Sequence, residues 1–457
     1  MNIYLHVEIS ARELDSKLLL AVLAASKGHE VVVAGFGEII NGIKTGILKP
    51  GIFHTKSLTP GRIKIDRHQK FIDKGFAVTS IDEEGGFLLN NQNSFVKRRF
   101  SEKTINQASA VFGWGRDVEI LKNNYPKSLS KIFKTGSPRI DLNKPILRDY
   151  WLKPKKNPKK PFLLVSSNFT CTFEKPFHEV LKTYRNSGYF ERNPELFKIQ
   201  FKQMSEEYLL LYTFIDAIKK ISDNNNFDIV LRPHTREPLE AWKTFLEGVP
   251  NVHVIKEEAI TPWIKNAFAL LHNSCSTAVE AAVAGVPVIS YVPFKREYLR
   301  KDFANKFGYY VETCEDLIRY INLIFKSYQD GSKDQTVDKS YETLSERVLV
   351  DNNELSANKI IKVWESLKIN KLSTSNNWIK FYWLCNIISF KRFAQKIMIK
   401  LFPNKFKHIK ENNKFPSLDK RDILSRVSRL QTILGIKENL QCKFISNKAI
   451  LIRINKN

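Results

Sequence analysis

The sequence predicts an α/β protein built from two doubly wound domains, followed by a basic helical extension at the C-terminal end. Short apolar runs alternate with helical segments through most of the chain, which is the pattern of parallel sheets covered by helices. A lysine- and proline-rich stretch interrupts this alternation, as an inter-domain linker does. The length of 457 residues also favours more than one core. We therefore divide the chain into a first domain at 1–145, a linker at 146–160, a second domain at 161–370 and an extension at 371–457.

The first domain opens with a β-α-β unit. Apolar runs at 3–7 and 31–35 predict two buried strands, and the segment between them carries apolar residues at helical spacing. Three more strands are expected at 76–81, 110–114 and 131–135. No GxGxxG follows the first strand, so a dinucleotide cofactor is not expected.

The second domain repeats the alternation. A helix is expected over about 205–222. Strands are expected at 162–168, 229–232, 252–255, 270–273 and 288–292. In an open parallel sheet, the residues that follow the strands gather at the carboxyl edge, where such sheets bind their ligands. Polar residues directly after these strands are therefore the first candidates for a functional site.

The net charge of +26 is the unusual feature of the composition. Such an excess favours contact with polyanions, namely nucleic acid, anionic lipid or a phosphorylated substrate. The five cysteines show no CxxC spacing, so neither a disulfide framework nor a zinc cluster is indicated, and a reducing compartment fits. The first residues do not resemble a signal peptide, and no stretch reaches the roughly 20 apolar residues of a membrane span. We expect a cytoplasmic protein.

The extension at 371–457 is strongly basic, with 19 Lys and Arg against 4 Asp and Glu. Its segment 378–393 mixes aromatic and basic residues. An amphipathic basic helix with aromatic residues on its apolar side is typical of a helix that lies in a membrane interface. We therefore expect peripheral association with the anionic inner face of the cytoplasmic membrane. The alternative is a helix that packs on its own domain and keeps a solvated basic face.

An acidic turn, Asp82-Glu83-Glu84-Gly85-Gly86, follows the expected strand at 76–81. A carboxylate at a strand end can take a proton from a hydroxyl group, so Glu83 and Glu84 are candidate general bases. Adjacent acids also repel one another, which raises the pKa of at least one of them. The two glycines allow a backbone bend that other residues disfavour, and we assign Gly85 to acceptor binding. A solvated acidic turn is the alternative.

A basic-Pro-His turn, Arg232-Pro233-His234, ends the apolar run at 229–232. An imidazole at this place can hydrogen-bond or protonate a leaving phosphate, and Arg232 can assist as a fixed cation. We therefore assign His234 to catalysis, and Arg232 and Pro233 to donor binding. A capping histidine on a loop is the alternative.

A hydroxyl-rich turn lies between the expected strand at 270–273 and a helix of small residues. The first turn of a helix offers free N–H groups and the positive end of the helix dipole, which together bind phosphate. Hydroxyl groups add further donors, whereas a Ser or Thr that only caps the helix is the alternative. The candidate donor-binding residues are Asn273, Ser274, Ser276, Thr277 and Glu280, and His272 and Cys275 are expected to be packing residues.

Three further segments are candidates of lower weight. Gly136 lies in a Thr-Gly-Ser-Pro-Arg turn, and Ser167 and Asn168 lie in a Ser-Ser-Asn turn, each after an expected strand. These three residues are assigned to donor binding. Arg12 and Glu13, at the start of the first long helix, are assigned to acceptor binding. An ordinary turn explains each of the first two segments as well.

The turns follow one another in a particular order: acidic-acidic-Gly in the first domain, then basic-Pro-His, then a Ser/Thr cluster. In this order they resemble the motifs of bacterial sialyltransferases and polysialyltransferases, which use CMP-activated nonulosonic acids. Residues 1–370 are also similar to a group of bacterial surface carbohydrate biosynthesis proteins and, in outline, to transferases of the ulosonic acid Kdo. The resemblance implies a GT-B-like fold, with two Rossmann-like domains that face a cleft.

The resemblance also implies roles for particular residues. The first glutamate of the acidic motif, Glu83, is the base, and Glu280 resembles the acid that many GT-B enzymes place on a donor ribose. This sequence departs from the family's His-Pro motif, because Thr235 follows His234. The turn therefore lacks the proline that stiffens the family's turn.

We therefore expect a glycosyltransferase of capsule or lipopolysaccharide synthesis. It would move an ulosonic acid such as Kdo, or a sialic-acid-like sugar, from a CMP donor to a glycan or glycolipid acceptor. The configuration at the anomeric carbon could be either inverted or retained. No residue spacing indicates a metal site, and no Asp-x-Asp clamp occurs, so neither a metal nor a cofactor is expected.

Two alternatives remain open. One is a polyol-phosphate transferase of the teichoic-acid type, which uses a CDP donor and relies on histidine as its base. The other is a basic nucleic-acid-binding protein. It would carry aromatic and basic side chains interleaved on a domain surface, whereas here they gather in one tail, so a nucleic-acid partner is not expected.

Overall fold

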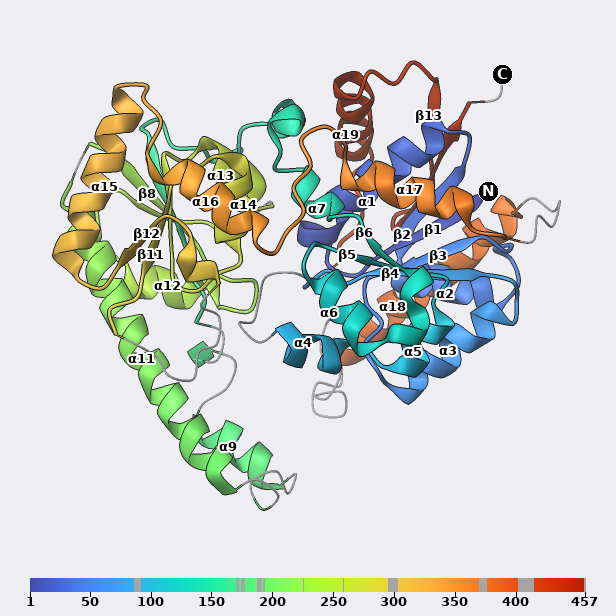
Figure 1. Cartoon of the computed structure of the whole chain (residues 1–457), viewed down its shortest axis with the longest axis horizontal. Coiled ribbons are helices and arrows are strands. Elements are labelled where there is room, and N and C mark those ends of the chain that lie inside the picture. Colours follow the sequence, from blue (N-terminus) through green and yellow to red (C-terminus); the bar gives the residue numbers. More distant parts are fainter. Residues whose placement is uncertain are drawn as a thin grey trace. The chain divides into compact units, whose positions relative to one another are not determined.

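The computed structural model describes residues 1–85, 92–169, 172–173, 177–186, 191, 194–224, 226–257, 259–294, 303–369, 376–401 and 415–455. The chain forms two compact α/β units (Figure 1). The first unit comprises Met1–Gly86, Gln92–Tyr150 and Arg347–Asn457, and the second contains Trp151–Glu346. The backbone therefore leaves the first unit near residue 150 and returns to it near residue 347.

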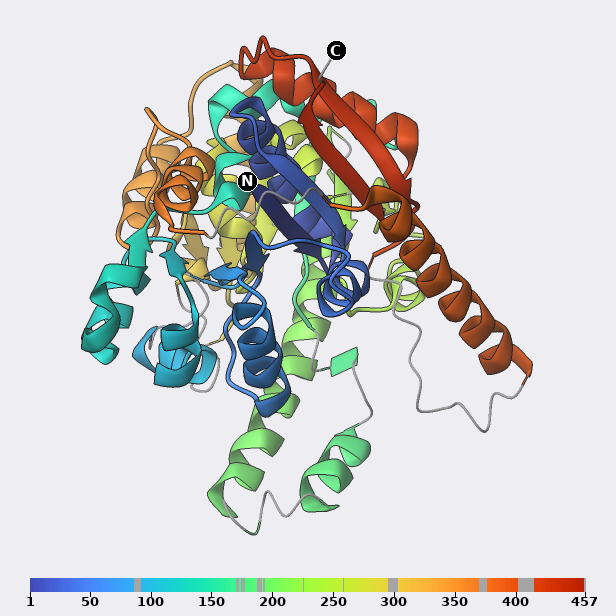
Figure 2. The same cartoon turned by 90° about the vertical axis from the view of Figure 1, so that its right-hand side faces the viewer.

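The first unit contains an eight-stranded sheet. Six strands run parallel in the order β2-β1-β3-β4-β5-β6, and an antiparallel hairpin, β13-β14, extends the sheet beside β2. The strands are β1 (Asn2–Val7), β2 (Glu30–Gly35), β3 (Ile52–Thr55), β4 (Ala77–Ile81), β5 (Ala110–Gly113), β6 (Ile132–Lys134), β13 (Leu440–Ser446) and β14 (Ala449–Ile454). Figure 2 shows the hairpin in red beside the blue strands at the start of the chain.

Helices flank this sheet (Figure 1). They are α1 (Ser10–Ser26), α2 (Phe36–Lys44), α3 (Arg62–Ile72), α4 (Gln92–Arg99), α5 (Glu102–Gln107), α6 (Asp117–Asn124), α7 (Pro138–Asp141), α17 (Ser356–Ser366), α18 (Trp378–Leu401) and α19 (Lys420–Ile433), with 3-10 turns η1 (Pro126–Lys131) and η2 (Pro145–Tyr150). Apolar residues of α2 and α18 pack with those of the sheet in one core cluster.

The second unit contains a six-stranded parallel sheet in the order β12-β11-β10-β7-β8-β9. Its strands are β7 (Phe162–Ser166), β8 (Asp228–Arg232), β9 (Val252–Val254), β10 (Ala269–His272), β11 (Val288–Tyr291) and β12 (Tyr309–Val311). Its helices are α9 (Phe177–Asn186), α11 (Pro194–Ser222), α12 (Leu239–Phe245), α13 (Thr261–Asn266), α14 (Thr277–Ala284), α15 (Cys314–Gln329) and α16 (Thr336–Ser345), with a 3-10 turn η3 (Ala304–Lys306). Helix α11 extends beyond the sheet, with α9 beside its far end (Figure 1).

Each sheet reverses its direction of growth once. In the first unit, β2 lies on one side of β1 and β3 lies on the other. In the second unit, β8 and β9 lie on one side of β7, and β10 to β12 lie on the other. At such a reversal the connections on either side diverge and leave a crevice at the carboxyl ends of the two central strands, which is where doubly wound sheets bind ligands.

The two strand orders confirm the predicted fold class of two Rossmann-like, doubly wound units. The strands expected at 3–7, 31–35 and 229–232 occur with small shifts of their ends. Strands β3, of four residues, and β12, of three residues, were not expected. The helix expected over about 205–222 begins earlier, at Pro194.

The last part of the chain differs most from its sequence-based description as a helical extension at 371–457. Helix α18 forms, but β14 pairs with β2 and makes the hairpin part of the first sheet. Helix α17 also belongs to the first unit, where the indole of buried Trp364 donates to Thr79 Oγ1 at 3.1 Å. Pairing between strands about 400 residues apart leaves no trace in local sequence patterns.

No helix in the described ranges combines the length and the apolar character that crossing a lipid bilayer demands.

A buried histidine in α3 carries an energetic penalty. His68 is fully buried and packs edge-on against Phe53, with ring centroids 6.1 Å apart. Neither ring nitrogen has a hydrogen-bond partner among the described residues. Burial lowers the pKa of His68 to about 3, so the ring is neutral at physiological pH, and its polar atoms are desolvated without compensation.

We expect His68→Met to raise the free energy of unfolding by about 1 kcal/mol near neutral pH, because it removes unsatisfied buried polar atoms at similar volume. The gain should grow by about 1 kcal/mol for each pH unit below the ordinary histidine pKa of 6.5, since there the unfolded wild-type chain binds a proton that the folded chain does not. Urea unfolding at neutral and mildly acidic pH measures both effects. A gain that does not change with pH would contradict the lowered pKa.

Candidate functional site

The carboxyl edge of the second sheet brings together the loops that follow β7 and β10, on either side of the reversal. The backbone N–H of Asn168, after β7, donates to Asn273 Oδ1 at 3.1 Å, and its side-chain amide donates to the Ser274 carbonyl at 3.1 Å. Ser167 is fully buried between the same loops. Four of the predicted donor-binding residues therefore lie side by side at the edge where a ligand is expected.

Ser274 adopts an unusual backbone conformation. Its φ angle is 54°, in the left-handed region that non-glycine residues seldom occupy. Asn305 holds it there, because Asn305 Oδ1 accepts from the Ser274 N–H at 3.0 Å and Asn305 Nδ2 donates to Ser274 Oγ at 2.9 Å. The hydroxyl of Ser274 is thus already engaged within the protein. Backbone strain of this kind is stored where surrounding contacts enforce it, often at functional turns.

Helix α14 begins directly after this turn with unused hydrogen-bond donors. The backbone N–H groups of Ser276 and Thr277 donate to no other residue in the described part of the chain. Ser276 makes no capping bond with its half-exposed side chain, and the side-chain NH₂ group of Asn273, Nδ2, has no hydrogen-bond partner among the described residues. Donors at the positive end of a helix favour an anion such as phosphate.

Two residues of this region have packing roles, as predicted. The backbone N–H of Cys275 donates to Nδ1 of buried His272 at 3.1 Å, and Nε2 of the same ring lies 2.9 Å from Ser290 Oγ. Burial lowers the pKa of His272 to about 3, so the ring is neutral. Glu280 is also buried, in the first turns of α14.

The loop after β8 carries His234 in a half-buried position behind buried Pro233. His234 Nδ1 accepts from the backbone N–H of Arg236 at 3.3 Å, so the neutral ring carries its proton on Nε2. Glu237, in the same loop, accepts from the Ser167 hydroxyl and, at 2.5 Å, from the Phe169 N–H. Glu237 thereby fixes the His234 loop to the loop after β7.

The contacts of Arg232 lie within the protein, whereas the sequence predicted that its charge binds the donor. It is buried, its guanidinium lies 5.3 Å from the ring centroid of Trp263, and it donates to the Glu257 carbonyl. These contacts fix β8 to the next loop. They give Arg232 a structural role, and donor binding by this residue stays a prediction.

The carboxyl edge of the first sheet holds a buried ion pair. Lys17 Nζ, in α1, lies 2.8 Å from Glu83 Oε1, after β4, and both side chains are almost fully buried. Burial raises the pKa of Glu83, but the charge and hydrogen bond of Lys17, together with the charges of Arg139 and Arg12, outweigh burial, and the net pKa lies below its usual value. Glu83 is therefore ionised at neutral pH.

A second carboxylate lies in the same cluster. Glu13, one turn before Lys17 in α1, accepts from the Glu8 N–H at 2.8 Å and lies 3.6 Å from Lys56 Nζ. Burial and the neighbouring charge of Glu83 raise the pKa of Glu13. Lys56 follows β3, so the cluster lies at the reversal between β1 and β3.

The other acids of the turn differ in exposure. Asp82 is buried and forms two 2.8 Å hydrogen bonds with Arg99, and burial nevertheless raises its pKa. The side chain of Glu84 is 41% exposed and lies 3.6 Å from Arg12 and from Arg99. Of the two candidate bases, Glu84 is the one whose side chain reaches solvent, whereas that of Glu83 is 5% exposed.

Both singled-out glycines of the first unit are required by close packing. A Cβ atom on Gly85 would lie 2.6 Å from the Trp114 ring, and Gly85 does not adopt a positive φ angle. Glycine is therefore needed here to make room for the Trp114 indole, whose N–H donates to the Asp82 carbonyl at 2.7 Å. The expected backbone bend is not the reason. A Cβ atom on Gly136 would lie 2.5 Å from Ser356 Oγ, so this glycine allows α17 to approach. Gly86 lies outside the described residues.

Sequence reasoning missed several residues of these two edges. Lys17 stands four residues after Glu13 in α1, directly before the apolar half of the helix, and this i, i+4 spacing was an available signal. Lys56 and Glu237 follow strands, as the predicted residues do. Asn305 lies far from Ser274 in sequence, and no local pattern connects them.

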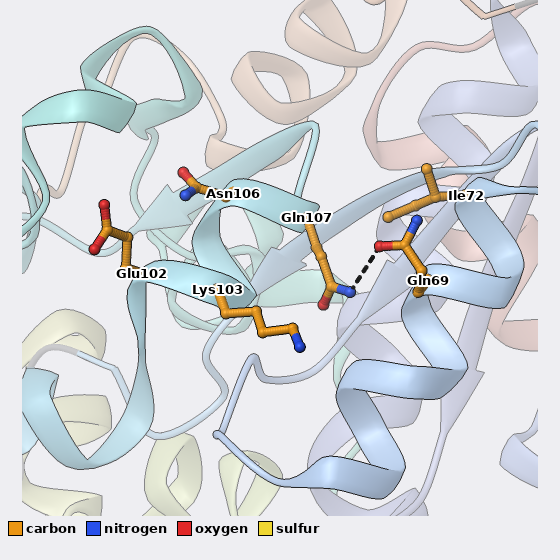
Figure 3. Close-up of a pocket in the computed structure, with 6 residues that line it drawn as sticks. All are labelled: Gln69, Ile72, Glu102, Lys103, Asn106 and Gln107. Atoms are coloured by element: carbon orange, nitrogen blue, oxygen red, sulfur yellow. Dashed lines mark hydrogen bonds between the residues drawn. The ribbon is translucent and has the colours of Figure 1, made fainter.

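A surface depression elsewhere in the first unit contains none of the candidate residues. It has a volume of about 710 Å³ and lies between α3 and α5, where Gln107 Nε2 donates to Gln69 Oε1 at 3.1 Å (Figure 3). Within the described residues, no group of three or more His, Cys, Asp or Glu side chains is arranged to hold a metal ion.

Comparisons with known proteins give only distant likenesses. Neither a protein-family model nor a curated protein matches the chain. Similar solved structures include a candidate UDP-N-acetylglucosamine 2-epimerase from Listeria monocytogenes, with 15% identity, a TM-score of 0.48, and 82% of this chain and 98% of that chain covered.

Two transferases are among the other similar structures. A glycosyltransferase from Rickettsia africae is 12% identical, with a TM-score of 0.44 and coverage of 80% of this chain and 97% of that one. The wall teichoic acid polymerase TagF is 12% identical, with a TM-score of 0.40 and coverage of 69% and 72%. Likenesses at this level identify neither a reaction nor a substrate.

The buried pair in the first unit yields a stability prediction. Lys17→Met leaves Glu83 without its counter-charge, and we expect it to lower the free energy of unfolding by about 3 to 5 kcal/mol. Adding Glu83→Gln should restore more than half of this loss, because the uncompensated charge is then gone. Urea unfolding of the wild type and the variants measures these differences.

The matched control is Lys243→Met. It breaks an exposed pair of similar length, Lys243 with Glu240 at 2.9 Å, and should cost less than about 1 kcal/mol. A double variant that is no more stable than Lys17→Met would show that Glu83 does not depend on Lys17.

Proposed function

We propose that this chain is a glycosyltransferase of bacterial surface polysaccharide synthesis. It transfers an ulosonic acid such as Kdo, or a sialic-acid-like sugar, from a CMP donor to a glycan or glycolipid acceptor. The observation that carries the proposal is the start of α14, at the reversal of the second sheet, where the N–H groups of Ser276 and Thr277 have no partner among the residues that the structure describes. The choice of CMP and of the sugar rests on the resemblance of the three turns to sialyltransferase motifs.

The second unit binds the nucleotide in this proposal. The N–H groups of Ser276 and Thr277, together with the Ser276 hydroxyl, donate to the phosphate oxygens. His234 carries its proton on Nε2, since Nδ1 accepts from Arg236, and this N–H donates to the oxygen that leaves with CMP. Both groups offset the negative charge that appears on the phosphate as the bond to the sugar breaks.

The first unit supplies the base. The bond between the anomeric carbon and the phosphate oxygen breaks, its electron pair leaves with CMP, and a hydroxyl of the acceptor forms the new bond to the sugar. The proton of that hydroxyl passes to a carboxylate of the acidic turn. We assign it to Glu83, which is ionised because Lys17 lowers its pKa below the usual value. Glu84, half-exposed on the same turn, is the alternative base.

Nucleotide binding is tested with Ser276→Asp. Aspartate is favourable at a helix start, so α14 should keep its stability, but its charge repels phosphate. We expect the affinity for CMP to fall at least about tenfold, a loss of about 1.4 kcal/mol or more. Isothermal titration and thermal shift with CMP, CDP, UDP and an oligonucleotide measure binding and its selectivity.

Two controls accompany this measurement. Ser276→Asn keeps a capping residue without charge, and Gln335→Asp places the same charge at the start of α16 in the same unit. Gln335→Asp should bind CMP within about twofold of the wild type, and Ser276→Asn, which loses the hydroxyl but adds no charge, should bind CMP more tightly than Ser276→Asp. Binding of an oligonucleotide but not CMP would overturn the proposal, and a preference for CDP would favour the polyol-phosphate transferase.

The role of His234 is tested with His234→Asn. Loss of this hydrogen-bond donor to the leaving oxygen should lower turnover by about 100-fold or more, and because the residue lies in a half-buried loop, the melting temperature should change little. Release of CMP from CMP-Kdo and CMP-sialic acid, with and without acceptor glycans, measures turnover. His178→Asn, in exposed α9, is the control. Near-normal turnover of His234→Asn would remove His234 from the mechanism.

A further inference from the structure

Among the described residues, helix α18 is held to the first unit along one side. Phe381 and Cys385 are fully buried in the core cluster of the first sheet. Further along, Arg392 forms an ion pair with buried Glu38 of α2, and Ser389 Oγ donates to Asn447 Oδ1 in the β13-β14 turn at 3.3 Å. These contacts recur every three to four residues, so they fix the rotation of the helix about its axis.

The opposite side of α18 presents a row of apolar side chains to solvent. We call it the α18 apolar stripe. Its members are Ile379, Trp383, Ile387, Phe390, Ile397 and Leu401, and each side chain is between 41% and 74% exposed. Their spacing of three, four or seven residues places them on one face of the helix. Isolated exposed apolar residues are ordinary, but a continuous row over six turns marks a binding surface.

The charge around the stripe selects its partner. Within Trp378–Leu401 there are five Lys and Arg and no Asp or Glu. Lys380 and Lys391 are exposed beside the stripe, whereas Arg392 is engaged by Glu38. A second copy of this chain would bring like charges together, and the net charge of +26 adds to that repulsion. An anionic surface that also accepts apolar side chains satisfies both features.

We infer that the α18 apolar stripe docks the protein on an anionic lipid surface, with the helix lying in the interface plane. Trp383 and Phe390 enter the boundary between headgroups and acyl chains, while Lys380 and Lys391 contact acidic headgroups. The inference rests on α18 and its contacts in the first unit, and it is independent of the proposed reaction.

The experiment uses point variants of the full chain. Removal of 371–457 would take β13 and β14 from the sheet. A loss of vesicle binding could then not be distinguished from a loss of folding. Trp383→Ser/Phe390→Ser removes two exposed side chains, and we expect it to weaken vesicle binding at least about tenfold. Lys380→Gln/Lys391→Gln should weaken binding about fivefold for each lysine.

Matched controls remove exposed apolar side chains and exposed lysines that lie outside α18. Ile63→Ser/Leu152→Ser deletes two apolar side chains that are 83% and 61% exposed, and Lys70→Gln/Lys103→Gln deletes two exposed charges of α3 and α5. Both should bind as the wild type does. Thermal unfolding of every variant shows whether the fold is kept.

Co-sedimentation is measured with vesicles of equal parts phosphatidylcholine and phosphatidylglycerol, and with phosphatidylcholine alone. We expect binding to the mixed vesicles only, and weaker binding at high salt. Equal binding to the two kinds of vesicle, or unchanged binding by Trp383→Ser/Phe390→Ser, would overturn the inference. So would a wild-type dimer in solution that the same double variant converts to monomers, because the stripe would then bind a second copy.

Discussion

Parallel pairing is the constraint on which both sheets depend. It places the carboxyl ends of all the parallel strands at the same edge of each sheet, and where the strand order reverses, the loops diverge and lose backbone partners. Side chains must then satisfy the exposed polar groups. In the second unit Asn168 bridges to Asn273 and Ser274. In the first unit Lys17 neutralises Glu83. The residues that complete the fold at each edge are thus also the ones available for chemistry.

The two edges differ in the kinds of side chain that satisfy their polar groups. At the edge of the second unit, amides and hydroxyls connect the loops after β7 and β10, and the N–H groups of Ser276 and Thr277 have no partner within the described ranges, so an added anion would find donors there. The edge of the first unit concentrates carboxylates whose charges are balanced by lysines and arginines, and the charge of Glu83 contributes to raising the pKa of buried Glu13. A donor phosphate suits the former, and proton transfer from a hydroxyl suits the latter.

The C-terminal segment both packs into the first unit and presents an apolar surface to solvent. The indole of Trp364 reaches Thr79 in the sheet, and β14 adds a strand beside β2. These contacts position α18, whose buried side is specified by the core and whose other side is left apolar and exposed. The same helix therefore serves folding with one face and carries an unsatisfied apolar surface on the other. Only a partner outside the described residues would bury that surface.

The sequence by itself determined the α/β class, most strand positions and the turns that follow them, because hydrophobic periodicity and turn residues are local properties. It therefore located Ser276 at a helix start and Glu83 at a strand end. Tertiary structure alone decided that Glu83 is buried against Lys17 with a lowered pKa, that Gly85 makes room for Trp114, and that the hairpin completes the first sheet. Each of these depends on residues that are distant in sequence and meet only when the sheet forms.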